Sequence, residues 1–409
     1  MLEALTPDTQ TTLLLVGRFS KSSEVKPLTT VEYNRLAKQL HELELRPADL
    51  VREIPKGLVA DTARLTTLLS RGTSLALAIE RWTRLGIWVI GRADEAYPKL
   101  LKRKLRGAAA PILYCAGNAE LMNAVAVCIV GSRNVSDAGL EFATELGKRC
   151  ATEGLAVVSG DARGVDRAAM DGALDKGGNV IAVLVDALTK AVLSKRNREA
   201  ILAGKLALIT PYDPEGGFTV SKAMDRNKYM YALGSAAVVV DSDTKGGTWT
   251  GAVENEKQQW TPAFVRVAAD APVGNQRLAD LGLRPIVPQD PLPNLRAFLF
   301  SSKDDGPLQP DLLQEKPQPI APPTFRAGKS LYAYFLDGLT SWLAHGPQLD
   351  TAIADRFELE LAQSRRWLDR ALDEGVLEKL QRPTRYALRT DNVSPDAAGN
   401  SNTKSDLLL

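Results

Sequence analysis

The sequence has few of the residues on which metal and redox chemistry depend. Its 409 residues include only two histidines, His41 and His345, which lie far apart in the chain. Its three cysteines, Cys115, Cys128 and Cys150, form no C-x-x-C pair. Histidine and paired cysteine are the usual ligands of zinc and the usual carriers of proton and thiol chemistry. We therefore expect no metal site, no cofactor and no histidine-based catalysis, and we interpret the cysteines as buried thiols.

Long apolar runs and an excess of one charge are also absent. No segment approaches the roughly 20 apolar residues that cross a bilayer, and the N-terminus lacks the basic and apolar regions of a signal peptide. Fifty-one basic residues balance 49 acidic ones, so a nucleic-acid site would have to be a local basic patch. These absences predict a cytoplasmic protein of two or three domains that makes no contact with membranes.

What the sequence does contain is a regular alternation of strand-like and helix-like segments. Apolar runs predict strands at 125–130, 155–159, 179–184, 206–210, 236–241 and 262–267. Amphipathic segments predict helices near 137–153, 165–176, 195–204, 220–232 and 248–259. Such alternation is typical of βαβ units, so we expect an α/β fold with a mainly parallel sheet.

The composition changes along the chain and suggests five regions. Residues 1–80 have helical periodicity and predict a helical accessory domain, followed by the α/β core with its leading segment at 81–300. Residues 301–327 are rich in proline and charge and predict a linker. Residues 328–390 predict three helices and a hairpin, the pattern of a winged helix, and 391–409 predict a disordered tail.

Two strand-to-helix turns combine small residues with an arginine. The first comprises Gly131, Ser132, Arg133 and Asn134, and the second comprises Ser159, Gly160, Arg163 and Gly164. Glycine lets the backbone approach a phosphate closely, and the planar guanidinium of arginine matches two phosphate oxygens. Because the carboxyl ends of parallel strands meet at one sheet edge, the two turns predict one wide anion site. The simpler alternative is that these glycines only allow a strand and a helix to pack closely.

Further basic segments extend this prediction along the same edge. They comprise Arg226, Asn227 and Lys228 on a helix, and Lys245, Gly246, Gly247 and Thr248 at a strand-to-helix turn. Tyr229 and Trp249 are candidates for stacking on bases, with packing as the alternative for Trp249. The basic group at 194–198 is more simply explained as a solvated helix face.

No complete catalytic arrangement is present in the sequence. Neither a Ser-His-Asp nor a Cys-His set can be assembled, and the Walker pattern G-x-x-x-x-G-K-[ST] does not occur. Asp166 begins a helix and is explained by the helix dipole, and Glu254 is better explained as a surface residue than as a catalytic carboxylate. The predicted anion site is therefore more typical of a protein that binds nucleic acid than of an enzyme that hydrolyses nucleotides.

These segments resemble the DNA-processing protein A (DprA/Smf) family of bacteria. The resemblance covers about residues 85–270 and is carried by VGSRN, VVSGDARGVDRAAMDGAL, SKRN, DRNKYMYALGSAAVVVDS and KGGTWTGAVE. It implies a Rossmann-like, doubly wound, mainly parallel sheet with a helical N-terminal domain and a C-terminal winged helix. It also implies a homodimer that binds single-stranded DNA, is not an enzyme, and helps to load RecA in DNA uptake and recombination. By motif position, the resemblance implies DNA contacts around Gly131, Ser132, Arg133, Gly160, Arg163, Gly164 and the group Arg226, Asn227 and Lys228.

The chain departs from the family pattern, which marks it as a divergent member. Met170 stands where the family usually has histidine, and residues 224–228 stand where the family has a longer arginine-rich stretch. The same superfamily contains nucleoside-monophosphate N-glycosidases with a G-G-x-G-T-x-x-E loop, which this chain matches only in part because Trp249 replaces a glycine. A nucleotide-binding sensor or N-glycosidase-like enzyme is therefore the alternative function.

Overall fold

The structure is a computed structural model that falls into two units, Met1–Asp304 and Asp305–Leu409. It describes residues 5–19, 25–58, 61–287, 294–300, 331–343, 346–356, 361–380 and 385–388. The predicted tail at 391–409 and the predicted linker at 301–327 lie outside the described residues. No helix in the described part of the chain is long and apolar enough to cross a membrane.

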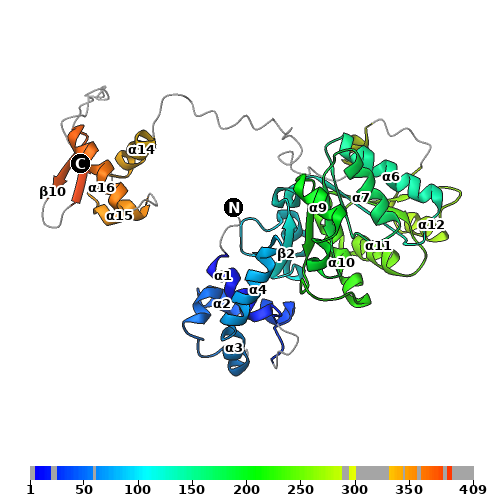
Figure 1. Cartoon of the computed structure of the whole chain (residues 1–409), viewed down its shortest axis with the longest axis horizontal. Coiled ribbons are helices and arrows are strands. Elements are labelled where there is room, and N and C mark those ends of the chain that lie inside the picture. Colours follow the sequence, from blue (N-terminus) through cyan, green and yellow to red (C-terminus); the bar gives the residue numbers. More distant parts are fainter. Residues whose placement is uncertain are drawn as a thin grey trace, which may run out of the picture. The chain divides into compact units, whose positions relative to one another are not determined.

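The first unit is built around a nine-stranded sheet (Figure 1). Its strands are β1 (Ile87–Gly91), β2 (Ile112–Gly117), β3 (Ala126–Gly131), β4 (Ala156–Ser159), β5 (Val180–Val183), β6 (Leu206–Thr210), β7 (Ala236–Asp241), β8 (Ala263–Arg266) and β9 (Arg284–Ile286). The strand order is β1-β2-β6-β5-β4-β3-β7-β8-β9. All neighbours from β6 to β9 are parallel, and β1 and β2 extend the sheet in antiparallel fashion. The predicted α/β class and mainly parallel sheet are confirmed.

Helices cover both faces of this sheet, because alternate residues of each strand point to opposite faces. In β3, Val127 and Ile129 join one apolar core, whereas Cys128 and Val130 join the other. The first core also takes residues from α6 (Asp137–Thr152), α7 (Val165–Asp175), α8 (Leu188–Ala191) and α13 (Leu295–Phe300). The second takes residues from α5 (Lys99–Leu105), α10 (Val220–Leu233), α11 (Gly247–Gln258) and α12 (Val273–Asp280). Burial on both faces explains why the strands read as continuous apolar runs.

The N-terminal helices divide their packing between the sheet and a core of their own. They are α1 (Pro7–Val16), α2 (Thr30–Glu42), α3 (Thr62–Leu69) and α4 (Gly72–Arg84). Leu13 of α1 and Trp82 of α4 belong to the first core of the sheet, and the Trp82 ring meets the Tyr114 ring edge-on at 5.1 Å. Leu36 and Leu65 belong instead to a separate small core between α2 and α3. The helical segment at 1–80 therefore shares part of its core with the sheet.

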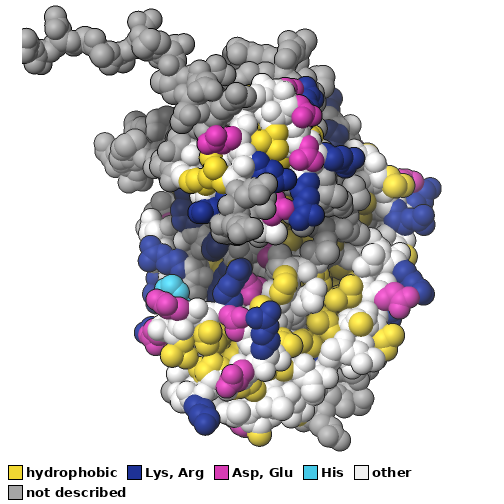
Figure 2. All heavy atoms as spheres, turned by 90° about the vertical axis from the view of Figure 1, so that its left-hand side faces the viewer, with side chains coloured by type: hydrophobic (Ala, Val, Ile, Leu, Met, Phe, Trp, Pro, Cys, Tyr) yellow, Lys and Arg dark blue, Asp and Glu magenta, His cyan; other side chains and the backbone are white. Residues whose placement is uncertain are grey.

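The surface of the protein mixes charges of both signs, as the near-zero net charge predicts. On the face shown in Figure 2, basic and acidic side chains are interspersed among polar and apolar ones. Any preference for an anionic ligand must therefore come from a local arrangement of side chains.

The second unit contains three helices followed by a hairpin. Its elements are α14 (Leu331–Leu343), α15 (Asp350–Arg356), α16 (Leu361–Asp373), β10 (Leu377–Leu380) and β11 (Arg385–Leu388). The two strands pair antiparallel, and a small core contains Phe335, Leu339, Ile353 and Leu368. This order of elements agrees with the predicted one, and its assignment as a winged helix stays a prediction.

Candidate functional site

A cleft lies where the strand order of the sheet reverses. β3 has β4 on one side and β7 on the other, so the turns after these strands diverge and leave a crevice at their carboxyl ends. The crevice holds two adjoining cavities of about 400 and 430 Å³. We call the first, between the turns after β3 and β7, the switch-point cavity. The second, between the turns after β4 and β5 and helices α8 and α9 (Lys195–Leu202), is the side cavity.

Most of the predicted site residues meet in the switch-point cavity. Its lining includes Gly131, Ser132, Arg133, Asn134, Arg226, Asn227, Lys245, Gly246, Gly247 and Thr248. Helix α11 begins at this cavity with Gly246 as its N-cap, and no side chain caps it. The first N–H groups and the positive end of the helix dipole therefore lie beside the lysine and arginines. This combination suits an anion such as a phosphate.

Arg226 is a buried cation at the junction of the two cavities. Only 6% of the residue is exposed, and its Nη1 donates a hydrogen bond to the Val183 carbonyl at 3.1 Å. The Asp166 carboxylate lies 3.9 Å away and accepts the Gly160 N–H at 3.2 Å. Burial lowers the pKa of Arg226 and raises the pKa of Asp166. Nε of Arg226 has no hydrogen-bond partner among the described residues, which leaves a donor available in a desolvated place.

Gly160 has no side chain because Arg226 occupies that space. A Cβ atom on Gly160 would lie 1.3 Å from Nη1 of Arg226. Gly164 has φ +82°, and a Cβ atom there would lie 2.4 Å from the Ser132 carbonyl oxygen. These glycines hold the two predicted turns against each other and against the arginine. The alternative that these glycines allow close packing is therefore supported, and the packing that they allow is that of the two turns around Arg226.

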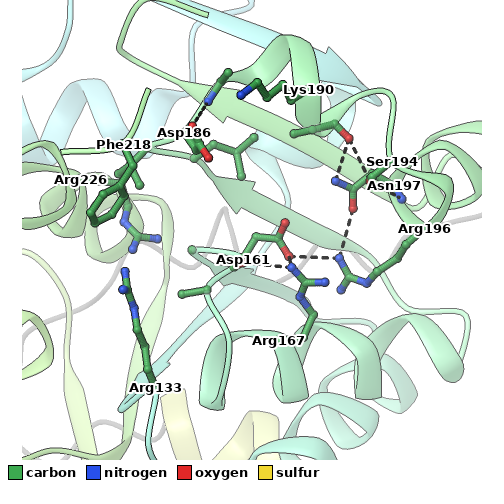
Figure 3. A pocket seen from close by; sticks show the side chains of 16 residues that line it. Arg133, Asp161, Arg167, Asp186, Lys190, Ser194, Arg196, Asn197, Phe218 and Arg226 are labelled. Atoms are coloured by element: carbon green, nitrogen blue, oxygen red, sulfur yellow. Dashed lines mark hydrogen bonds and ion pairs between the residues drawn. The ribbon is translucent and has the colours of Figure 1, made fainter. Parts of the chain in front are cut away.

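Arg133 and Phe218 form the exposed part of the junction. Both line both cavities, and the Arg133 guanidinium lies 5.5 Å from the centre of the Phe218 ring. Figure 3 shows Arg133 and Arg226 extending toward each other, with Phe218 beside Arg226. Phe218 belongs to the loop after β6 and is 45% exposed, so part of its ring is accessible to a ligand.

Several predicted residues lie away from the cavities. Arg163 is exposed and donates to Asn134 Oδ1 at 3.2 Å, which places it beside the first turn but outside both linings. Lys228 lines neither cavity and donates to Asp225 at 2.5 Å. The Ser159 hydroxyl is buried and donates to the Ile129 carbonyl at 2.6 Å.

The predicted stacking role of Tyr229 is wrong. Its ring is buried in the second core of the sheet, where no base can reach it. Trp249 is half-buried and packs against the same core, in agreement with its packing alternative.

The side cavity contains the residues that sequence reasoning missed. It adds Asp161, Arg167, Asp186, Lys190 and Arg196, whereas the sequence marked Arg196 only as part of a basic helix face. The loop after β5 carries no motif, and Arg167 follows the second predicted turn by only three residues. In the described residues, no group of three or more His, Cys, Asp or Glu side chains is placed to hold a metal ion.

Comparison with known proteins identifies the family of the core. Residues 88–278 match the sequence model of DNA recombination-mediator protein A. The core of this chain is therefore similar to that family. The match supports the resemblance that the motifs indicated.

Individual proteins are similar to this chain in sequence or in fold. The putative DNA processing protein DprA of Mycobacterium tuberculosis is 30% identical over 208 residues, which cover 47% of this chain and 51% of the relative. The chain therefore spans about half the length of the curated relatives it matches. DNA processing protein A of Streptococcus pneumoniae has the same fold, with a TM-score of 0.53 at 19% identity over 69% of this chain and 95% of that chain. A further similar structure is that of DNA processing protein A from Helicobacter pylori, whose description names its single-stranded DNA binding mode. It is 22% identical and covers 52% of this chain and 94% of that chain, with a TM-score of 0.42.

Proposed function

We propose that this protein binds single-stranded DNA in the cleft. Phosphates of the strand contact Arg133, Arg226 and the turn Lys245–Thr248, and one base stacks on Phe218. The observation that carries this proposal is the junction, where a buried arginine with a free donor, an exposed arginine and an exposed aromatic ring converge. Basic grooves with aromatic platforms are the general means by which single strands are held. The match of the core to the model of DNA recombination-mediator protein A supports the same ligand.

The geometry also accounts for how binding is favoured. Arg226 is already largely desolvated in the free protein, so a phosphate that binds at the accessible part of its guanidinium displaces little water. Gly160 and Val183 fix the guanidinium in position, which reduces the entropy lost on binding. Arg133 is exposed, so an approaching strand contacts it before it contacts the buried Arg226.

The localisation, the oligomeric state and the role in recombination are proposed from the resemblance to the family. We propose a cytoplasmic homodimer that protects single strands and assists RecA loading in DNA uptake and recombination, as the sequence motifs imply. The alternative of an N-glycosidase-like enzyme lacks its candidate carboxylate at the cleft, because Glu254 lines neither cavity. The alternative of a nucleotide sensor requires no such carboxylate.

Charge reversal at Arg133 tests the proposal. Fluorescence anisotropy of a labelled oligo-dT strand measures the affinity of the wild type, Arg133→Glu and Arg35→Glu. Arg35 is exposed on α2 and lines neither cavity, so its reversal changes the net charge equally. We expect Arg133→Glu to weaken binding at least tenfold, since a lost contact and a new repulsion add, and Arg35→Glu to change it less than twofold. Equal effects of the two variants, or no binding by the wild type, would refute the proposal.

A further inference from the structure

Two arginines in the side cavity share one carboxylate. Oδ1 of Asp161 accepts a hydrogen bond from Nη1 of Arg196 at 3.1 Å and pairs with Nη2 of Arg167 at 2.9 Å. The dashed lines in Figure 3 show this arrangement, in which both guanidinium groups approach Asp161 in the wall of the cavity. We propose that Arg167 and Arg196 form a second phosphate subsite, which the Asp161 carboxylate fills while no strand is bound. This inference rests on the proposed function, because it assigns the next phosphate of the same strand.

The backbone at Asp161 is unusual for a residue with a side chain. It follows directly on Gly160 at the end of β4 and has φ +51°, in the left-handed region. Strained positions of this kind cluster at ligand sites, where the surrounding structure holds them in place. The Asp161 side chain is only 12% exposed, and burial raises the pKa of its carboxyl group against the two arginines. The carboxylate thus occupies a desolvated position between two cations, which is the position that suits a phosphate.

The charges around the side cavity sum to a positive value, which favours the binding of a further anion. Five basic side chains line the cavity: Arg133, Arg167, Lys190, Arg196 and Arg226. They face the carboxylates of Asp161 and Asp186 in the lining, and those of Asp171 beside Arg196 and Asp166 beside Arg226. The Arg226 side chain is 7% exposed and its Nε lacks a hydrogen-bond partner, which independently points to a missing ligand at the edge of this cavity. Nε of Arg167 is likewise buried without a hydrogen-bond partner among the described residues.

Arg196 remains in place when Asp161 releases it. Its Nε donates to Asp171 at 2.6 Å, on α7 and outside the cavity lining, and its Nη1 also donates to Asn197 at 3.1 Å. A phosphate offers its oxygens to the same N–H groups that the Asp161 carboxylate uses, so the two anions compete. Because the cavities share Arg133 and Arg226, a strand with one phosphate at the junction presents the adjacent phosphate to the side cavity.

The competition between the Asp161 carboxylate and a DNA phosphate predicts the effect of Asp161→Asn. The amide keeps the shape and tolerates the left-handed backbone, but it no longer neutralises the arginines. We expect oligo-dT affinity to rise by roughly three- to tenfold, and the slope of log affinity against log salt to steepen by about 0.7, the value for one additional phosphate. Asp161→Gly relieves the backbone and removes the carboxylate, so it should show the same gain even if the asparagine variant folds poorly.

Asp175→Asn is the matched control. It removes the same charge from an exposed position at the end of α7 that lines neither cavity, so we expect less than a twofold change in affinity. The double variant Asp161→Asn/Arg196→Gln should lose the gain of Asp161→Asn. Wild-type affinity in both Asp161 variants, or an equal gain in Asp175→Asn, would overturn the second subsite while leaving single-strand binding intact.

Inorganic phosphate separates this inference from the proposed function. Thermal unfolding in increasing phosphate reports on anion binding without DNA, and the stabilisation should begin at lower phosphate concentration in Asp161→Asn than in the wild type. If neither protein binds oligo-dT but this difference is found, the proposed function fails and the anion subsite stands. If phosphate acts equally on both proteins, the subsite is refuted.

Discussion

The arginines of the switch-point cavity and those of α16 resemble each other in the sequence but differ in their partners. Among the described residues, Arg133 has an aromatic ring beside its guanidinium and no carboxylate partner, and Arg226 lies 3.9 Å from the Asp166 carboxylate with its Nε unpaired. On α16, Arg365 donates to Asp350 and Arg370 to Glu374, each at 2.8 Å. An arginine that is already paired gains less from a phosphate than one that is not, and in the side cavity a phosphate has to compete with Asp161. The comparison indicates that the pairing of the arginines, rather than the number of basic residues, distinguishes the candidate anion site.

The change that should disturb the cleft most is Gly160→Ala. The new methyl group would overlap the Arg226 guanidinium and force it out of its position. We expect a loss of unfolding free energy of about 1–3 kcal/mol from overpacking, together with at least a tenfold loss of oligo-dT affinity. Urea unfolding and anisotropy measure the two effects. Unchanged DNA affinity in a folded Gly160→Ala protein would show that Arg226 does not contact the strand.

An intermediate effect is expected from Phe218→Ala. The ring is already exposed, so its removal should leave the midpoint of thermal unfolding nearly unchanged. Loss of one stacked base costs about 1–3 kcal/mol, which makes binding roughly 5- to 150-fold weaker. Phe218→Tyr keeps the ring and should bind like the wild type. Equal affinities of the alanine and tyrosine variants would contradict stacking.

The smallest effect should come from α16. Arg370 is held by Glu374 and lies 4.0 Å from the centre of the Tyr332 ring, so Arg370→Gln should change oligo-dT affinity less than twofold. The same anisotropy titration measures it. A loss larger than that of Phe218→Ala would move the main DNA contact to the second unit and reverse the comparison made above.

Most of the sheet could be predicted from the sequence because its strands are buried on both faces. The predicted strand at 236–241 coincides with β7, and the predicted helix at 220–232 ends one residue before α10 does. The three-residue strand β9 and helix α12 were not predicted. β9 contains Pro285, and α12 is fixed by Asn275, whose side chain bonds to the carbonyls of Val240 and Arg266. Such contacts depend on the tertiary fold and leave no periodic pattern.

The site was predicted less completely, for a related reason. Turns that directly follow strands could be found, and they supplied the lining of the switch-point cavity. Phe218 lies in a loop eight residues after the end of β6, and Arg167 lies within α7, so neither belongs to a strand-end motif. The burial of Arg226 depends on the missing side chain of Gly160, which lies 66 positions earlier in the chain.

The salt dependence of wild-type binding tests the central claim most directly. Arg133, Arg226 and Lys245 offer contacts to three phosphates at the junction and the α11 turn. Each phosphate contact to a single strand contributes about −0.7 to the slope of log affinity against log salt, so the account predicts a slope of about −2 for oligo-dT. A slope near zero would contradict the assignment of the cleft as a site that binds DNA phosphates. The absence of binding at low salt would contradict it as well.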